Sequence, residues 1–128
     1  MEGYSVKITY ASKELSVKEK LAVKDFTAAV SIDSALDNDG SLIIAPAMYA
    51  ILDVHNERSK KEKDYRKFVV VDRAGTKYTT GSESFFTSFK EIFDIMADEA
   101  PDEEYSIECF RKPSKNYAGK TFLTCTIV

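Results

Sequence analysis

The sequence has few of the residues that build metal centres or disulfide frameworks. Its 128 residues include two cysteines, one histidine and no tryptophan. Cys109 and Cys125 are too widely spaced for a CxxC-type zinc site and too few for a disulfide framework, so we expect reduced, packed thiols. His55 has no second histidine or nearby cysteine to share a metal with. We therefore predict no metal site and no cofactor.

Long hydrophobic runs are also missing. The longest ones, such as Leu42 to Ala47, fall far short of the roughly 20 residues that cross a bilayer. Met1 to Tyr4 lacks the basic segment and apolar stretch of a signal peptide, so we expect a cytoplasmic protein without a membrane partner. With 44% hydrophobic and 30% charged residues, the chain is neither disordered nor fibrous in type. Its length predicts a single domain over residues 1–128.

The charge is unevenly distributed. The net charge of −3 argues against a polyanionic partner. From Glu57 to Lys67, however, six basic residues accompany three acidic ones, and from Arg111 to Lys120 there are four basic residues and no acidic one. The rest of the chain is therefore strongly acidic. Such segregation can attract a phosphate backbone locally while the remaining surface keeps the protein soluble.

Residues 1–40 are expected to form an N-terminal extension. Alternating apolar and polar residues from Ser5 to Tyr10 predict a strand. The capping-box spacing of Ser16 and Glu19 predicts a short helix from Val17 to Asp25, with a strand as the alternative. The pattern of residues 30–36 is ambiguous, and the Asp-Asn-Asp-Gly sequence that ends at Gly40 predicts a turn.

Residues 41–128 have the element order of an OB-fold. The pattern predicts one long bent strand at Ser41 to His55, further strands at Arg66 to Asp72 and Thr76 to Thr80, a helix between Ser82 and Pro101, and strands at Tyr105 to Arg111 and Thr121 to Val128. Three strands, a helix and two strands make a five-stranded, partly open barrel. The predicted fold class is therefore mainly β with one long helix (α+β), an OB-like barrel that follows an N-terminal extension.

Strand alternation separates expected core positions from outward ones. Val69 and Val71 are expected to point inward, with Phe68 and Val70 outward. In the last two strands the residues expected in the core are Ile107, Cys109, Leu123 and Cys125, which leaves Phe110 and Phe122 on the opposite face. Exposed phenylalanines here would suit base stacking, but the interpretation we favour is that both pack beneath the extension.

In OB-folds, nucleic acid binds to one sheet face and to the loops between strands one and two and between strands four and five. Here those loops are the two basic segments, and each carries a tyrosine. Cations that follow phosphates and aromatic rings that stack on unpaired bases are the two requirements for binding single strands. Exposed hairpins are also lysine-rich merely because charged side chains solvate turns, and the tyrosines can pack on the barrel rim. The candidate nucleic-acid-binding residues are Lys60, Lys61, Tyr65, Arg66, Arg111, Lys112, Lys115, Tyr117 and Lys120.

No enzyme signature has the required spacing. The segment from Gly75 to Ser82 resembles a phosphate loop, but Gly81 is followed by Ser82 where such a loop has lysine. The acidic residues near Asp98 suit a solvated face, and the sequence offers no plausible pair of nucleophile and base. We therefore predict a protein that is not an enzyme.

The C-terminal half resembles the small single-stranded-DNA-binding proteins of phages and mobile elements of Gram-positive bacteria. The likeness rests on the Gly turn at Val71–Gly75, the strand with Tyr78, a Ser-rich helix start, and the hairpin tip at Pro113–Lys120. It implies coating or protection of displaced strands during replication or transfer, with contacts at Lys115, Tyr117 and Lys120. One departure is the end at Ile127-Val128, without the acidic tail by which many bacterial single-strand binders recruit partners.

Two functions follow as hypotheses. The first is sequence-independent binding of single-stranded DNA, with RNA as an open alternative and with self-association and replication proteins as further partners. The second is a phage- or plasmid-encoded interaction module that acts on a host protein through its acidic surface. An oligonucleotide titration separates the two.

Overall fold

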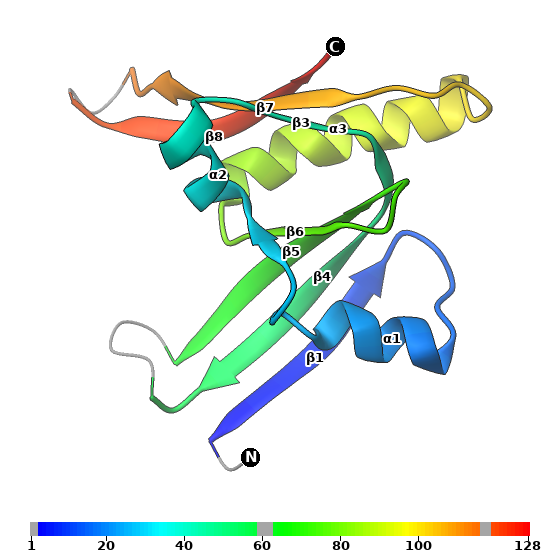
Figure 1. Cartoon of the computed structure of the whole chain (residues 1–128), viewed down its shortest axis with the longest axis vertical. Helices are drawn as coiled ribbons and strands as arrows, with labels where there is room; N and C mark the ends of the chain where they lie inside the picture. The colour runs from blue at the N-terminus through cyan, green and yellow to red at the C-terminus, as the bar shows by residue number, and fades with distance from the viewer. Residues whose placement is uncertain (1–2, 59–62, 116–118) are drawn as a thin grey trace. The chain divides into compact units, whose positions relative to one another are not determined.

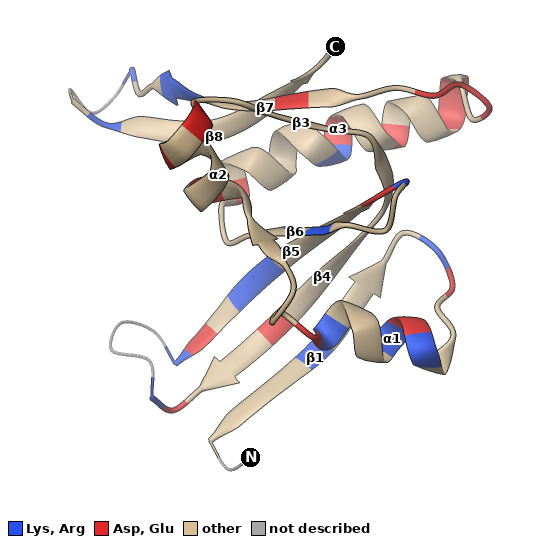
Figure 2. Cartoon of the chain, viewed as in Figure 1, with Lys and Arg blue, Asp and Glu red and all other residues tan. Residues whose placement is uncertain are grey.

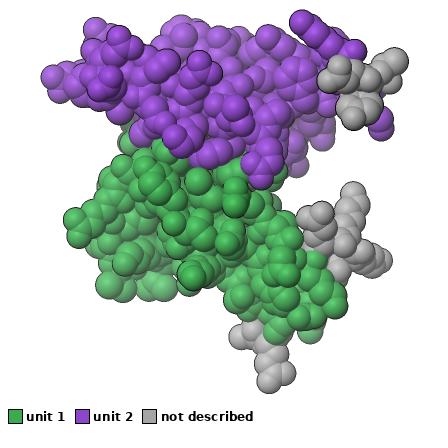
Figure 3. Space-filling model, turned by 180° about the vertical axis from the view of Figure 1, so that it is seen from behind, with its two compact units in different colours: residues 1–30, 47–81 green, residues 31–46, 82–128 purple. Residues whose placement is uncertain are grey.

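The computed structural model describes residues 3–58, 63–115 and 119–128. The chain forms two compact units, one of residues 1–30 and 47–81 and the other of residues 31–46 and 82–128 (Figure 3). The chain therefore passes from one unit to the other after Val30, after Pro46 and after Gly81. In the described part of the chain, no helix has the length and apolar character that crossing a membrane requires.

The first unit is built on a sheet with the strand order β1-β4-β5-β6-β2 (Figure 1). Its elements are β1 (Tyr4–Ala11), α1 (Val17–Lys24), β2 (Val30–Ser31, at the unit boundary), β4 (Pro46–Asn56), β5 (Asp64–Asp72) and β6 (Lys77–Thr80). β1 runs antiparallel to β4, and β5 antiparallel to β6. The buried cluster that holds this unit together consists of Leu15, Val23, Met48, Ala50, Leu52 and Val69.

Helix α1 is fixed at both ends by side chains. The hydroxyl of Ser16 accepts from the Glu19 amide, and the Glu19 carboxylate accepts from the Ser16 amide, so the predicted capping box is confirmed. At the other end, the ammonium group of Lys77 on β6 donates to the carbonyls of Ala22 at 2.6 Å and Asp25 at 2.7 Å. A cation at a helix C-terminus satisfies orphan carbonyls and suits the helix dipole.

The second unit contains a three-stranded sheet in the order β3-β7-β8. Its elements are α2 (Ile32–Asp39), β3 (Leu42–Ile44), α3 (Glu83–Glu99), β7 (Ile107–Pro113) and β8 (Thr121–Ile127). The Ser84 hydroxyl of α3 donates to the Leu123 carbonyl at 2.8 Å, and the hydroxyls of Ser88 and Thr124 bond at 2.9 Å. The predicted helix after Ser82 is confirmed, with the Ser82 hydroxyl capping it through the Phe85 amide.

The predicted mainly β character and the long helix after Ser82 are confirmed, but the OB-like barrel is not. The described residues form two sheets and three helices and do not close into a barrel. The single bent strand expected from Ser41 to His55 is in fact two strands that belong to different sheets, with Ala45 between them. Pro46 cannot donate a backbone hydrogen bond, which favours a break there. β7 then pairs with β3, with Leu42 opposite Cys109.

Two local predictions also need correction. Asp37 to Asp39 form the last turn of helix α2, and Gly40, with a φ of 78°, caps that helix in the left-handed region. Phe68 and Val70 were expected to point outward, yet they are 2% and 1% exposed. Both faces of β5 are therefore buried at this point, and simple alternation does not describe the strand.

Candidate nucleic-acid interface

The second basic segment forms the hairpin between β7 and β8. Pro113 lies opposite Thr121 and Lys112 opposite Phe122 in the antiparallel ladder. The Ser114 amide donates to the Lys120 carbonyl at 2.8 Å, which continues the ladder toward the tip. The hairpin therefore holds Lys112 and Lys120 on opposite strands next to the turn.

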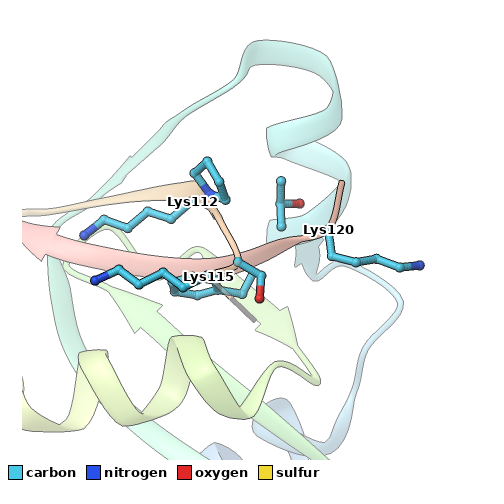
Figure 4. A pocket seen from close by; sticks show the side chains of 7 residues that line it. Lys112, Lys115 and Lys120 are labelled. Carbon is cyan, nitrogen blue, oxygen red and sulfur yellow. The ribbon is translucent and has the colours of Figure 1, made fainter. Parts of the chain in front are cut away.

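This hairpin carries a pocket of about 640 Å³, which we call the hairpin pocket. Its lining residues are Lys112, Pro113, Ser114, Lys115, Lys120, Thr121 and Phe122. Figure 4 shows the side chains of Lys112 and Lys115 running in the same direction, while that of Lys120 extends the other way. The three ammonium groups are thus spread along the hairpin, which suits an extended polyanion better than a single compact anion.

The lysines of the hairpin pocket are not neutralised by carboxylates. Lys112, Lys115 and Lys120 are exposed, and none of them forms an ion pair with another described residue. Arg111 differs, because its guanidinium donates to the Asp37 carboxylate at 2.6 Å and to the Asp33 carbonyl at 3.2 Å. Arg111 therefore ties β7 to helix α2, and the three lysines supply the unpaired positive charge.

An aromatic face adjoins the lysines. Phe110 and Lys112 lie on the same side of β7, and the cross-strand neighbour of Lys112 is Phe122, so all three share one face. The Lys112 ammonium lies 5.7 Å from the centre of the Phe110 ring, within the range of a cation–π contact. Phe122 is 38% exposed, whereas Cys109 and Cys125 on the other face are buried. The predicted division of the two faces is confirmed.

The first basic segment joins β4 to β5, and its cations are differently placed. Lys60 and Lys61 lie outside the described residues. Arg66 lies 3.9 Å from the Asp53 carboxylate and Lys63 3.2 Å from that of Glu57. Tyr65 is partly buried. Two of the described cations of this hairpin, Lys63 and Arg66, thus have carboxylate neighbours, whereas the Lys67 ammonium lies 5.7 Å from the centre of the Phe26 ring.

His55 forms an ionic cluster at the base of the same hairpin. Its Nδ1 lies 2.7 Å from the Asp64 carboxylate and its Nε2 2.6 Å from that of Glu57. These hydrogen bonds, the one to Asp64 first, raise the pKa of His55 above its ordinary value. The bonds from His55 and then from Lys63 lower the pKa of Glu57. The imidazole therefore links the end of β4 to the start of β5 through these two hydrogen bonds.

The cysteines and histidine have the structural roles that their isolation indicated. Cys109 and Cys125 are free, face each other across β7 and β8, and are buried. Burial raises the pKa of each thiol to about 12, so neither forms a reactive thiolate near neutrality. Among the described residues, no three histidine, cysteine or carboxylate side chains gather in a way that could hold a metal ion.

Of the candidate site residues, the structure brings Lys112, Lys115 and Lys120 together in one pocket. Arg111 precedes Lys112 on β7 but is bonded to helix α2. Tyr117, like Lys60 and Lys61, lies outside the described residues, and Tyr65 and Arg66 belong to the other unit. Sequence reasoning omitted Phe122 from the candidate set. Its position opposite the expected core face was the signal that could have included it.

Comparison with known proteins gives one finding. A family model with the description "Phage Single-stranded DNA-binding protein" matches residues 5–128, almost the whole chain. Neither the curated proteins nor the solved structures contain a match to this sequence. The match spans both compact units and includes the hairpin pocket.

Proposed function

Because this chain belongs to the family of phage single-stranded DNA-binding proteins, we propose that it binds single strands without sequence preference and coats them during phage DNA replication. The same role serves the transfer of a mobile element, and the site of action is the cytoplasm of the host cell. The observation that carries the proposal is the hairpin pocket, where three lysines without an ion-pair partner in the described part of the chain adjoin an exposed phenylalanine.

The lysines act on the phosphates. Contacts to phosphate hold a strand in place but carry no sequence information, so Lys112, Lys115 and Lys120 favour any single strand equally. In this proposal the three lysines, whose side chains extend in two directions from the hairpin (Figure 4), contact different phosphates of the strand. Arg111 has a positioning role, because its bonds to Asp37 and Asp33 hold the end of β7 nearest the hairpin tip against α2.

The aromatic side chains act on the bases. Phe122 is 38% exposed and lies opposite Lys112, and Phe110 lies on the same face. Stacking on an aromatic ring contributes roughly 1–3 kcal/mol per base and tolerates every base. We assign Phe122 the first stacking position, and we place Tyr117 in the same role on the basis of its sequence position in the hairpin.

The first hairpin extends the contact in this proposal. Lys60 and Lys61 would add phosphate contacts, and Tyr65 with Arg66 would accompany them. The support for these four residues is the basic, tyrosine-bearing composition of the segment. Their contribution is expected to be smaller, since Arg66 already lies near Asp53.

The test is a fluorescence titration of oligothymidine at several salt concentrations. The logarithm of the binding constant should fall linearly with the logarithm of the salt concentration. Replacing Lys112, Lys115 and Lys120 by Ala removes three phosphate contacts and should lower that slope by about 2, at roughly 0.7 per contact with a single strand. An unchanged slope would reject the hairpin pocket as the DNA site.

A matched control changes the same charge elsewhere. Lys7, Lys20 and Lys24 are exposed lysines of the first unit. Their replacement by Ala should leave the salt slope for a short oligonucleotide as it is in the unmodified protein. An equal loss of slope in both variants would show that the net charge of the protein, and not the hairpin, sets the affinity.

A further inference from the structure

A second groove lies on the first unit, between strand β1 and helix α1. It has a volume of about 460 Å³, and we call it the α1 groove. Its lining residues are Val6, Lys7, Ile8, Val17, Lys20, Leu21 and Lys24. Four aliphatic side chains and three lysines therefore meet in one place, on elements that take no part in the hairpin pocket.

The apolar part of the α1 groove is unusually open to solvent. Val17 is 75% exposed and Leu21 65% exposed, one helical turn apart on α1. Lys20 and Lys24 are one turn apart as well, and neither has an ion-pair partner among the described residues. Exposed aliphatic side chains bordered by unpaired cations are typical of a contact surface.

The chemistry of the α1 groove favours a protein segment over a nucleic acid strand. A DNA site needs aromatic rings on which bases stack, and the residues that line this groove include none. Aliphatic side chains together with lysines are complementary to a segment that carries carboxylates beside an aliphatic residue. Such a segment is present in this chain.

The segment from Glu91 to Glu104 contains seven acidic residues and no basic one. Figure 2 shows acidic residues gathered at the end of α3 and in the turn that follows. Ile95 on the same stretch of helix is 48% exposed. Asp98 and Glu99 lie in the last turn of α3, where negative charge opposes the helix dipole, so lysines from a partner would relieve that repulsion.

We propose that the α1 groove of one molecule binds the acidic end of α3 of a second copy. The two surfaces are different, so the contact is head-to-tail and each copy keeps a free groove or a free acidic end for the next. Figure 1 shows that the end of α3 lies at the far end of its unit from the β7–β8 hairpin, so the copy that supplies α3 keeps its hairpin pocket free. The inference rests on the proposed function, because a bound strand aligns the copies that touch.

Charge reversal separates this contact from DNA binding itself. The variant Lys20→Glu with Lys24→Glu should keep its affinity for an oligonucleotide that holds one molecule. On long polythymidine its cooperativity should fall about tenfold, since two exposed ion pairs and their apolar neighbours contribute on the order of a factor of ten. Reversal of the partner surface, Asp98→Lys with Glu99→Lys, should have the same effect, and a mixture of the two variants should recover cooperativity.

Cross-linking tests the pairing directly. Cys109 and Cys125 are buried, so a cysteine introduced at the surface is the accessible one. Leu21→Cys protein mixed with Ile95→Cys protein on polythymidine should give mixed dimers with a short bifunctional maleimide. Each single variant alone should give few. The mixture excludes links within one chain.

The cross-linking and binding results distinguish the head-to-tail contact from a second DNA site and from a failure of DNA binding itself. Cross-links between like variants, or no mixed dimers on DNA, would overturn the head-to-tail contact while leaving DNA binding intact. A loss of short-oligonucleotide affinity in Lys20→Glu with Lys24→Glu would show that the α1 groove is a second DNA site. That result would also overturn the head-to-tail contact. Failure of the proposed function is distinguishable, since the unmodified protein would then not bind the short oligonucleotide.

Discussion

The two basic hairpins have a similar sequence but different surroundings. Both combine lysines with a tyrosine between two strands. In the β4–β5 hairpin, Lys63 and Arg66 have the carboxylates of Glu57 and Asp53 as neighbours. In the β7–β8 hairpin, one cation, Arg111, bonds to a carboxylate, whereas the lysines of the hairpin pocket have no such partner among the described residues.

The comparison shows why counting lysines overestimates a phosphate site. A paired cation must lose its carboxylate before it gains a phosphate, and the freed carboxylate then repels the strand. The charge available to DNA is the unpaired charge. Because Lys63 and Arg66 have carboxylate neighbours and the lysines of the hairpin pocket have none among the described residues, we propose that the β7–β8 hairpin is the main site and the β4–β5 hairpin a secondary one.

The largest expected effect is on affinity. Replacing Lys112, Lys115 and Lys120 by Ala should weaken binding of oligothymidine about a hundredfold at 0.1 M salt, which follows from three lost phosphate contacts. Lys63→Ala with Arg66→Ala should weaken it only a few-fold. Fluorescence anisotropy at one salt concentration measures both, and equal losses would contradict the ranking of the hairpins.

A smaller effect is expected for the aromatic face. Phe122→Ala should weaken binding about tenfold, because a stacked base contributes roughly 1–3 kcal/mol. Phe122→Tyr keeps a ring and should retain most of the affinity. The melting temperature should change little because Phe122 is partly exposed. Weak binding by the Tyr variant would show that Phe122 serves the fold of the hairpin and not the base.

Arg111 should affect stability more than binding. Arg111→Ala removes the bond to Asp37 and should lower the free energy of unfolding by about 1 kcal/mol, typical of a partly exposed charged hydrogen bond. Asp37→Ala should cost a similar amount, and the double variant little more than either one alone. Denaturant unfolding of the four proteins gives the coupling. Additive losses would show that the two side chains do not interact.

The smallest expected effect concerns pH. The bonds to Asp64 and Glu57 raise the pKa of His55 above 6.5. The stabilisation of the fold by these bonds is therefore complete below pH 6.5 and is lost as the pH rises through the raised pKa. His55→Gln should therefore lower the melting temperature more at pH 6 than at pH 9. The pKa of Glu57 is lowered, so its contribution is lost only in acid, as the pH falls through that lowered value. A drop in melting temperature for His55→Gln that is the same at pH 6 and pH 9 would contradict the ionic cluster.

Local signals in the sequence predict the local structure well. The capping box at Ser16 and the helix after Ser82 are confirmed because each depends on residues within one or two turns. The Asp-Asn-Asp-Gly sequence predicts a turn, but the same residues also suit the end of a helix. Here Gly40 supplies the positive φ that ends α2.

Long-range pairing is where the prediction of the fold is incomplete. β3 pairs with β7 from more than 60 positions away, with Leu42 opposite Cys109, and no local pattern encodes that choice. The same limit applies to the site. The hairpin lysines are visible in the sequence, whereas the bond between Arg111 and Asp37 depends on where α2 packs.

Photo-cross-linking to oligothymidine tests the central claim most directly, because it identifies the side chains that touch the bases. Ultraviolet irradiation of the complex, followed by digestion and mass spectrometry, should place the main cross-links on the β7–β8 hairpin, with Phe122 among them. Cross-links confined to the first unit, with none between Phe110 and Phe122, would contradict the assignment of the hairpin pocket as the DNA site.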